Sequence, residues 1–169
     1  MLSKTMNQAL NEQVKWEMYS GYLYLSMSAY FAERGMGGFA QWMRVQAQEE
    51  LFHAMKFYDF INERGGSVLL QSIDAPRHAW KNVLEVFEET LSHERHVTER
   101  INNLANLAQD ERDHATGIFL QWFVTEQVEE EDSVNTVLGK LRMINGEGQG
   151  MLMLDAELGA RVFTPPAAA

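Results

Sequence analysis

Cysteine is absent from the 169 residues, and its absence excludes disulfides, thiolate catalysis, iron–sulfur clusters and cysteine-based zinc sites. Proline occurs only at Pro76, Pro165 and Pro166, so the long stretches on both sides of Pro76 are free to be helical. Basic residues are also scarce, since 14 lysines and arginines face 24 aspartates and glutamates and give a formal charge of -10. This balance argues against a nucleic-acid partner, because phosphate binding needs clustered positive charge. It suits cationic partners better.

Long hydrophobic runs are missing as well. No run approaches the ~20 apolar residues that a membrane helix needs, and the first ten residues lack the apolar centre of a signal peptide. We therefore expect a cytoplasmic protein that has no membrane partner. With 46% hydrophobic residues in a chain of this length, we predict one domain, over residues 1–169, with one packed core.

The apolar residues follow a helical period in four long segments. The first segment carries Leu10, Val14, Tyr24 and Phe31 on one face and stops at Gly35. The period predicts helices over about 4–34, 39–64, 82–109 and 113–144. A glycine-rich turn then precedes a short fifth helix over about 151–162, and residues 163–169 form a tail.

The connections between these helices are short, long and short. The segment 67–80 has no helical stripe and contains Pro76, so it reads as a crossover, whereas the other two connections are tight turns. This pattern predicts an all-α four-helix bundle made of two antiparallel pairs that are joined by one long crossover.

Acidic residues on the inner faces of these helices are the most informative feature of the sequence. Each of the four segments places polar side chains in line with its apolar stripe, at Glu17, at Glu50 and His53, at Glu94, and at Gln127 and Glu130. A buried carboxylate costs several kcal/mol unless it is neutralised, and these stripes contain no lysine or arginine. A cation would neutralise the group, while a buried hydrogen-bond network without metal is the alternative. Carboxylates with one imidazole suit Fe, Mn or Mg, one carboxylate such as Glu50 could bridge two ions, and iron fits redox use best.

Three segments carry a resemblance to a known family. Residues 17–25, 48–54 and 119–131 are similar to prokaryotic non-haem ferritins, members of the ferritin-like superfamily of carboxylate di-iron bundles. The resemblance implies a ferritin-like bundle with a di-iron centre. In that centre Glu17, Glu50 and His53 would hold the first iron and Glu50 and Glu94 the second. Gln127 would hydrogen-bond within it and Glu130 would complete it. The fourth helix offers Gln127 and Glu130 in place of a second Glu-x-x-His, so the second site is expected to be asymmetric.

The resemblance also implies a third iron site, whose residues match Glu49, Glu126, Glu129 and Glu130. Without the resemblance, residues 129–131 read as a solvated acidic run. Tyr24 would support the centre or supply an electron, unless it is a core tyrosine with a satisfied hydroxyl. No haem is expected, because packing explains the spacing of the methionines. The other histidines are expected on exposed faces or in turns: His78, His93, His96 and His114.

The function implied by the resemblance is iron storage. The chain would act as a ferroxidase, oxidising Fe(II) to Fe(III) with O2 or H2O2 and storing the product as a ferric mineral in a 24-subunit cage of its own copies. The fifth helix has an apolar face that is expected to make a subunit contact, formed by Met151, Leu152, Leu154 and Leu158. The alternatives are a di-iron oxidase or peroxidase that acts on another substrate without mineral storage, and a helical module without catalysis.

Overall fold

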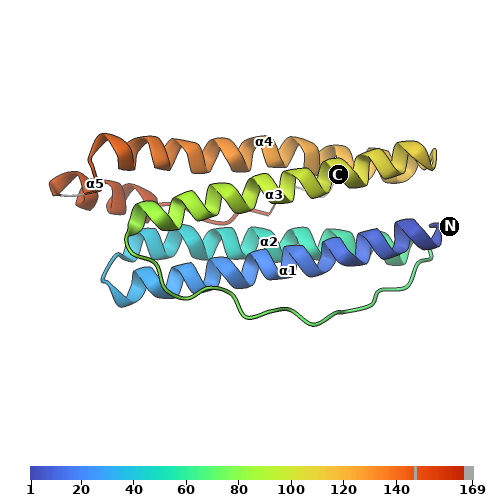
Figure 1. The fold of residues 1–169 in the computed structure, drawn as a ribbon, viewed down its shortest axis with the longest axis horizontal. Helices are drawn as coiled ribbons and strands as arrows, with labels where there is room; N and C mark the ends of the chain where they lie inside the picture. Colours follow the sequence, from blue (N-terminus) through green and yellow to red (C-terminus); the bar gives the residue numbers. More distant parts are fainter. Residues whose placement is uncertain (147, 166–169) are drawn as a thin grey trace.

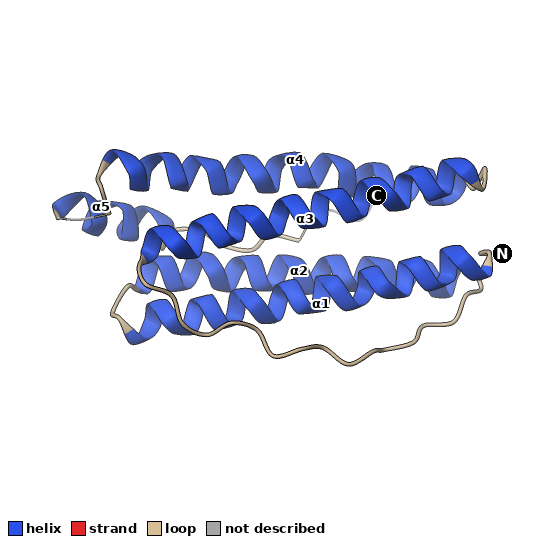
Figure 2. Cartoon of the chain, in the orientation of Figure 1, coloured by secondary structure: helices blue, strands red, loops and turns tan. Residues whose placement is uncertain are grey.

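Helices make up the secondary structure of the described chain. The computed structural model describes residues 1–146 and 148–165, and strands are absent from this part (Figure 2). The helices in chain order are α1 (Lys4–Glu33), α2 (Gly37–Glu63), α3 (Val83–Asp110), α4 (His114–Met143) and α5 (Gln149–Leu158). None of the described helices combines the length and apolar content that crossing a membrane requires.

The four long helices form two antiparallel pairs. Helix α1 packs against α2, and α3 packs against α4. The segment between Glu63 and Val83 runs along the length of the bundle before α3 begins (Figure 1). The predicted bundle class, with one long crossover, is therefore confirmed.

The ends of the long helices follow from local chemistry. At the start of α1 the Ser3 hydroxyl accepts a hydrogen bond of 2.9 Å from the Met6 N–H. The side chains of Asn82 and Asp113 cap α3 and α4 in the same way. The chain leaves α1 through Gly35, whose φ of +72° favours glycine.

The interior consists of two apolar regions. One surrounds the first half of α2 and includes Phe31, Phe39 and Phe87. The other surrounds the second half of α2 and includes Phe57 and other side chains from all four long helices. The buried polar side chains include Glu17, Gln46, Glu50, His53, Glu94, Gln127 and Glu130. In sequence they fall between the two apolar regions, near the middle of each helix.

The fifth helix differs from its predicted form. It ends at Leu158 instead of near residue 162, and it packs against α2 of the same chain. Oδ1 of Asp155 accepts hydrogen bonds of 2.9 and 3.0 Å from the N–H groups of Gly38 and Phe39 at the start of α2, where Met36 supplies no side-chain cap. Leu154 and Leu158 are buried in the core, so the prediction that these two leucines face another subunit is wrong, whereas Leu152 of the same predicted face is exposed.

Candidate metal centre

Three side chains from α1 and α2 come together at the middle of the bundle. Ligand atoms of Glu17, Glu50 and His53 all lie within 4.8 Å of one another, and the three side chains are buried. Nδ1 of His53 lies 4.0 Å from Oε2 of Glu17 and 3.7 Å from Oε2 of Glu50. Since metal–ligand bonds are about 2.1 Å long, two ligands of one ion are at most about 4.2 Å apart. The spacing therefore fits a single metal ion between them.

The two carboxylate oxygens that face His53 lack a hydrogen-bond donor. Oε2 of Glu17 and Oε2 of Glu50 are buried atoms without a partner among the described residues. Buried polar atoms in proteins are nearly always satisfied, and neither carboxylate forms an ion pair with a described lysine or arginine. A metal ion at this position would satisfy both oxygens, so the donor set fits the group that the sequence predicts.

A second buried carboxylate set comes from α3 and α4. The Tyr24 hydroxyl donates a hydrogen bond to Oε1 of Glu94, and Nε2 of Gln127 lies 3.2 Å from Oε2 of the same carboxylate. Gln127 also lies 3.3 Å from the Thr98 hydroxyl, which fixes the orientation of its amide. Both oxygens of Glu94 are thus held by donors, in contrast to the open oxygens of Glu17 and Glu50.

Burial and mutual repulsion control the protonation of these groups. Burial raises the pKa of Glu50 well above its usual range, and repulsion from Glu94 and Glu17 adds to the shift. Burial, with repulsion from Glu130, raises the pKa of Glu94 to about 8. The pKa of the Tyr24 hydroxyl is also raised, mainly by burial, so this group remains a hydrogen-bond donor. Without metal, the interior therefore favours protonated carboxyls.

The metal-free protein is expected to lose stability as the pH rises from about 4.5 to 8. Since the pKa of Glu94 is raised from 4.5 to about 8, the folded protein holds a proton that the unfolded chain releases near pH 4.5. This contribution is fully present below pH 4.5 and is lost as the pH rises through 8. The variant Glu94→Gln does not titrate, so its thermal midpoint at pH 8 should be about 5 °C above that of the parent, with little difference at pH 4.5.

Calorimetry of the metal-free protein at both pH values measures this effect. The matched control is Glu99→Gln, which removes an exposed carboxylate from the same helix and should follow the parent at both pH values. Equal pH dependence in Glu94→Gln and the parent would show that Glu94 is ionised in the folded interior.

Two glutamines that the sequence prediction missed bind the predicted ligands. Nε2 of Gln13 donates a hydrogen bond of 2.8 Å to Oε1 of Glu17, and Nε2 of Gln46 donates one of 2.8 Å to Oε2 of Glu130. Both glutamines are buried and lie four residues before Glu17 and Glu50 on the same helix faces. This four-residue spacing could have identified both glutamines from the sequence. Each amide holds one carboxylate oxygen, and in Glu17 this leaves Oε2 facing His53.

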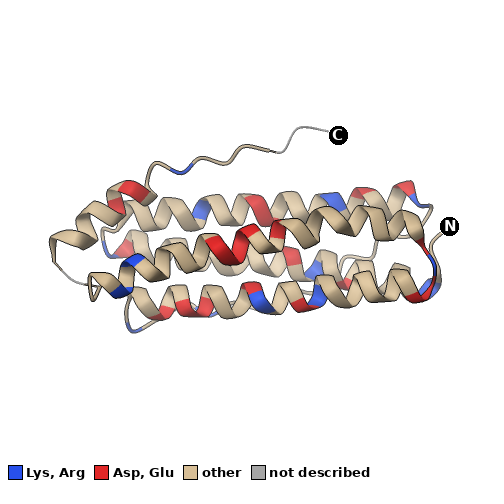
Figure 3. Ribbon diagram, turned by 90° about the horizontal axis from the view of Figure 1, so that it is seen from above, with Lys and Arg blue, Asp and Glu red and all other residues tan. Residues whose placement is uncertain are grey.

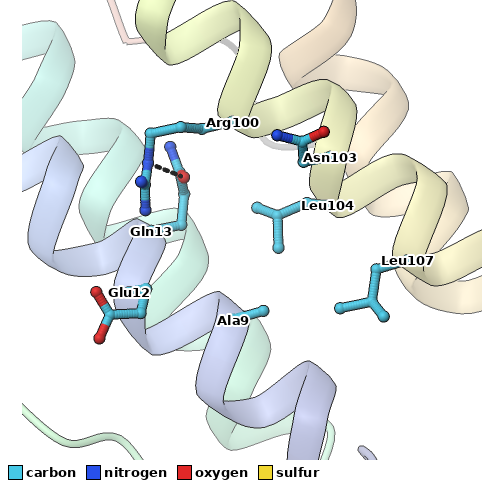
Figure 4. Close-up of a pocket in the computed structure, with 7 residues that line it drawn as sticks. All are labelled: Ala9, Glu12, Gln13, Arg100, Asn103, Leu104 and Leu107. Carbon is cyan, nitrogen blue, oxygen red and sulfur yellow. Dashed lines mark hydrogen bonds between the residues drawn. The ribbon is translucent and has the colours of Figure 1, made fainter.

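Gln13 also links the centre to the surface. Nε of Arg100 lies 3.3 Å from Oε1 of Gln13, across the groove between α1 and α3 (Figure 4). Both residues line a cavity of about 290 Å³. This cavity is on the outside of the bundle and is distinct from the space between Glu17, Glu50 and His53.

The residues predicted for the third site do not all meet. Ligand atoms of Glu126 and Glu130 lie within 4.8 Å of one another and of a ring nitrogen of His53, whereas Glu49 pairs with Arg161. Glu129 is exposed. Glu131 accepts a hydrogen bond of 2.7 Å from Thr98 on α3. The acidic run at residues 129–131 is therefore not uniformly solvated. Glu129 is exposed, Glu130 is buried and Glu131 binds α3.

One histidine was placed wrongly by the sequence prediction. His93 is partly buried between α1 and α3, and its Nε2 lies 2.7 Å from the Ser20 hydroxyl. Burial lowers the pKa of His93 to about 4, so the ring is neutral at physiological pH. His78, His96 and His114 are exposed, as predicted.

Comparison with known proteins agrees with the family resemblance found in the sequence. Residues 7–144 match the family model described as a ferritin-like domain. The chain is 42% identical to a bacterial non-heme ferritin of Staphylococcus epidermidis over 96% of this chain and 98% of the relative, and 39% identical to that of Staphylococcus aureus with the same coverage.

Solved structures agree with these relatives. An open-pore ferritin from Archaeoglobus fulgidus is 49% identical, covers 96% of this chain and 100% of its own, and superposes with a TM-score of 0.95. A closed form of that ferritin, engineered by mutagenesis, gives the same TM-score at 50% identity, with 97% of this chain and 100% of the other covered. The chain therefore belongs to the ferritin family.

Proposed function

We propose that the protein is an iron-storage subunit whose interior centre oxidises Fe(II) to Fe(III). One observation carries the proposal. Two buried carboxylate oxygens, Oε2 of Glu17 and Oε2 of Glu50, face Nδ1 of His53 and lack any other described partner. A hard, anionic pocket with one imidazole suits iron, and the family relationship supports iron over other cations.

In this proposal the first Fe(II) binds Glu17, Glu50 and His53, and the second binds Glu50 and Glu94. Gln127 holds the Glu94 carboxylate, and Glu130 completes the surroundings from α4. Since carboxyls with raised pKa are protonated before metal binds, binding releases protons from Glu50 and Glu94. The negative charge thereby created favours Fe(III) over Fe(II) and drives the oxidation.

The electron balance requires two irons for each oxidant molecule. Each Fe(II) gives one electron, and O2 takes up both electrons with two protons to form H2O2. When H2O2 is the oxidant, it takes up two electrons and two protons to form two waters. Tyr24 donates a hydrogen bond to Glu94 and is buried beside the centre, so it holds this ligand in place and is the side chain best placed to supply a further electron.

Glu126 and Glu130, with His53, support a third iron position between α2 and α4. Glu129 lies at the surface next to this group and would receive iron that leaves it. Figure 3 shows acidic positions near the middle of the helices. We infer that this position carries oxidised iron from the centre toward the mineral.

Storage requires a shell of many copies of the chain, for which we propose 24 subunits. Leu25, Leu51 and Tyr22 are each about half exposed, and together with Ile73 they line a cavity of about 270 Å³ that reaches Glu17. Contiguous exposed apolar side chains are typical of subunit interfaces. This surface, where the crossover lies against α1 and α2, supports association with a second copy.

The test combines particle mass with iron chemistry. Light scattering should give a particle with the mass of 24 chains of 19.4 kDa. Anaerobic titration should show two Fe(II) bound per subunit, both oxidised on addition of O2, and later iron should stay in solution as mineral within the particle. A monomer that binds no Fe(II) would refute both parts of the proposal.

A further inference from the structure

The chain does not leave the bundle after α5. Residues 159–163, which we call the return segment, turn back beside the bundle, as Figure 3 shows for the chain that follows α5. Nε2 of Gln41 lies 3.2 Å from the carbonyl oxygen of Arg161, and the ring of Phe163 lies 6.2 Å from that of Phe52. Both contacts are with α2, so the return segment follows this helix from its first turns toward its middle.

Arg161 binds Glu49, the predicted third-site carboxylate that does not join Glu126 and Glu130 in the structure. Nη2 of Arg161 donates a hydrogen bond of 2.6 Å to Oε2 of Glu49, and the guanidinium lies 4.6 Å from the ring centroid of Trp42. Both partners of the ion pair are about four-fifths buried. A pair that is hydrogen-bonded, stacked and largely shielded from water is well ordered. Glu49 is therefore already neutralised by a cation from its own chain.

Glu49 lies one helical turn before His53 on α2, so both side chains are on the same face of this helix. His53, Glu126 and Glu130 share a potential metal position, and the charges of Glu130 and Glu126 act on Glu49. Glu49 is outside this group of three but is the neighbouring carboxylate on α2 that could reach an ion bound there. A divalent ion there would approach the guanidinium of Arg161, and two positive charges at such short range repel each other.

We infer that Arg161 is an internal counter-cation that competes with metal for Glu49 and so weakens the third metal position. This inference rests on the proposed function. The guanidinium and the metal cannot both use Glu49 without repulsion, so an ion must either displace the return segment or bind through Glu126, Glu130 and His53 without Glu49. In both cases the third ion binds less tightly than the two ions at the buried centre, which suits a position through which iron passes.

Zinc titration of the metal-free protein tests the inference without any redox step. We expect the parent to bind two Zn(II) tightly per subunit and a third more weakly, as measured by isothermal calorimetry. Arg161→Gln should strengthen binding of the third ion about tenfold and change the first two by less than about twofold. Arg161→Lys retains the charge, so its third ion should bind nearly as weakly as in the parent.

Two further variants locate the effect. Arg142→Gln removes the same charge from an exposed pair with Glu88 on α3, 3.7 Å apart, and should leave the third ion unchanged. Adding Glu49→Gln to Arg161→Gln should abolish the tenfold gain, because the released ligand is then missing. If Arg161→Gln binds two ions like the parent and the third no more tightly, the inference is wrong. If the parent binds no tight pair of ions, the proposed centre fails instead.

Discussion

Replacing Glu50 and His53 together by alanine is expected to slow the initial oxidation of Fe(II) at least about 100-fold. Removing a group that only orients a metal ligand costs about 10- to 100-fold in affinity or activity, and here two ligands are lost at once. Glu50 is also the proposed link between the two irons. Stopped-flow absorbance after mixing Fe(II) with aerated protein measures the rate.

The matched control replaces the same two residue types, one glutamate and one histidine, at the surface. His96 and Glu99 are also separated by three residues, on an exposed part of α3, and their double alanine variant should oxidise Fe(II) at the parent rate. The shell must form in both variants, as judged from particle mass. Oxidation at the parent rate in Glu50→Ala with His53→Ala would place the reaction outside the bundle interior.

Gly38→Ala is expected to release α5 from α2 and lower the free energy of unfolding by about 3 kcal/mol or more. A Cβ at Gly38 would lie 1.6 Å from the backbone oxygen of Asp155, so the backbone of α5 must move. The displacement would break the two hydrogen bonds that Asp155 accepts from α2 and expose Leu154 and Leu158. A cap contributes about 1 kcal/mol and each buried leucine about 1.5 to 3 kcal/mol.

Gly37→Ala is the control for this prediction. It lies one residue away in the same helical turn, and a Cβ there would meet nothing within 4 Å. Its thermal midpoint should stay close to that of the parent, while that of Gly38→Ala should fall by roughly 6 °C or more. Equal midpoints for the two variants would mean that α5 does not pack on α2 in solution. Since the return segment follows α5, Gly38→Ala should also free Glu49 from Arg161.

The bundle and the inward carboxylates were predictable because they depend on local rules. A helix places residues three and four apart on one face, so Glu17, Glu50 and Glu94 had to point inward once their apolar neighbours formed the core. Helix ends were equally local, as the Ser3 cap and Gly35 show. The spacing of Glu50 and His53 by three residues already placed both on one turn.

The contacts of the fifth helix and of the return segment were not predictable in this way. Asp155 caps α2 by binding the N–H of Gly38, 117 residues earlier, and Arg161 binds a carboxylate 112 residues earlier. Both contacts depend on the direction of α5 relative to α4 and on the turn that the chain makes after Leu158. Periodicity carries no information on that direction, which is why the fifth helix was extended too far and its apolar face assigned to another subunit.

The amino-acid sequence was sufficient to predict which helices form, which faces they bury and which acidic side chains share the interior, because each of these follows from the 3.6-residue period and the cost of burying charge. The packing of the helices was needed to learn which carboxylate oxygens remain open, as in Glu17 and Glu50, and which are already satisfied, as in Glu94 and Glu49. A hydrogen bond or ion pair needs its partner within about 3 Å. Partners from different helices reach that distance only when the helices have packed.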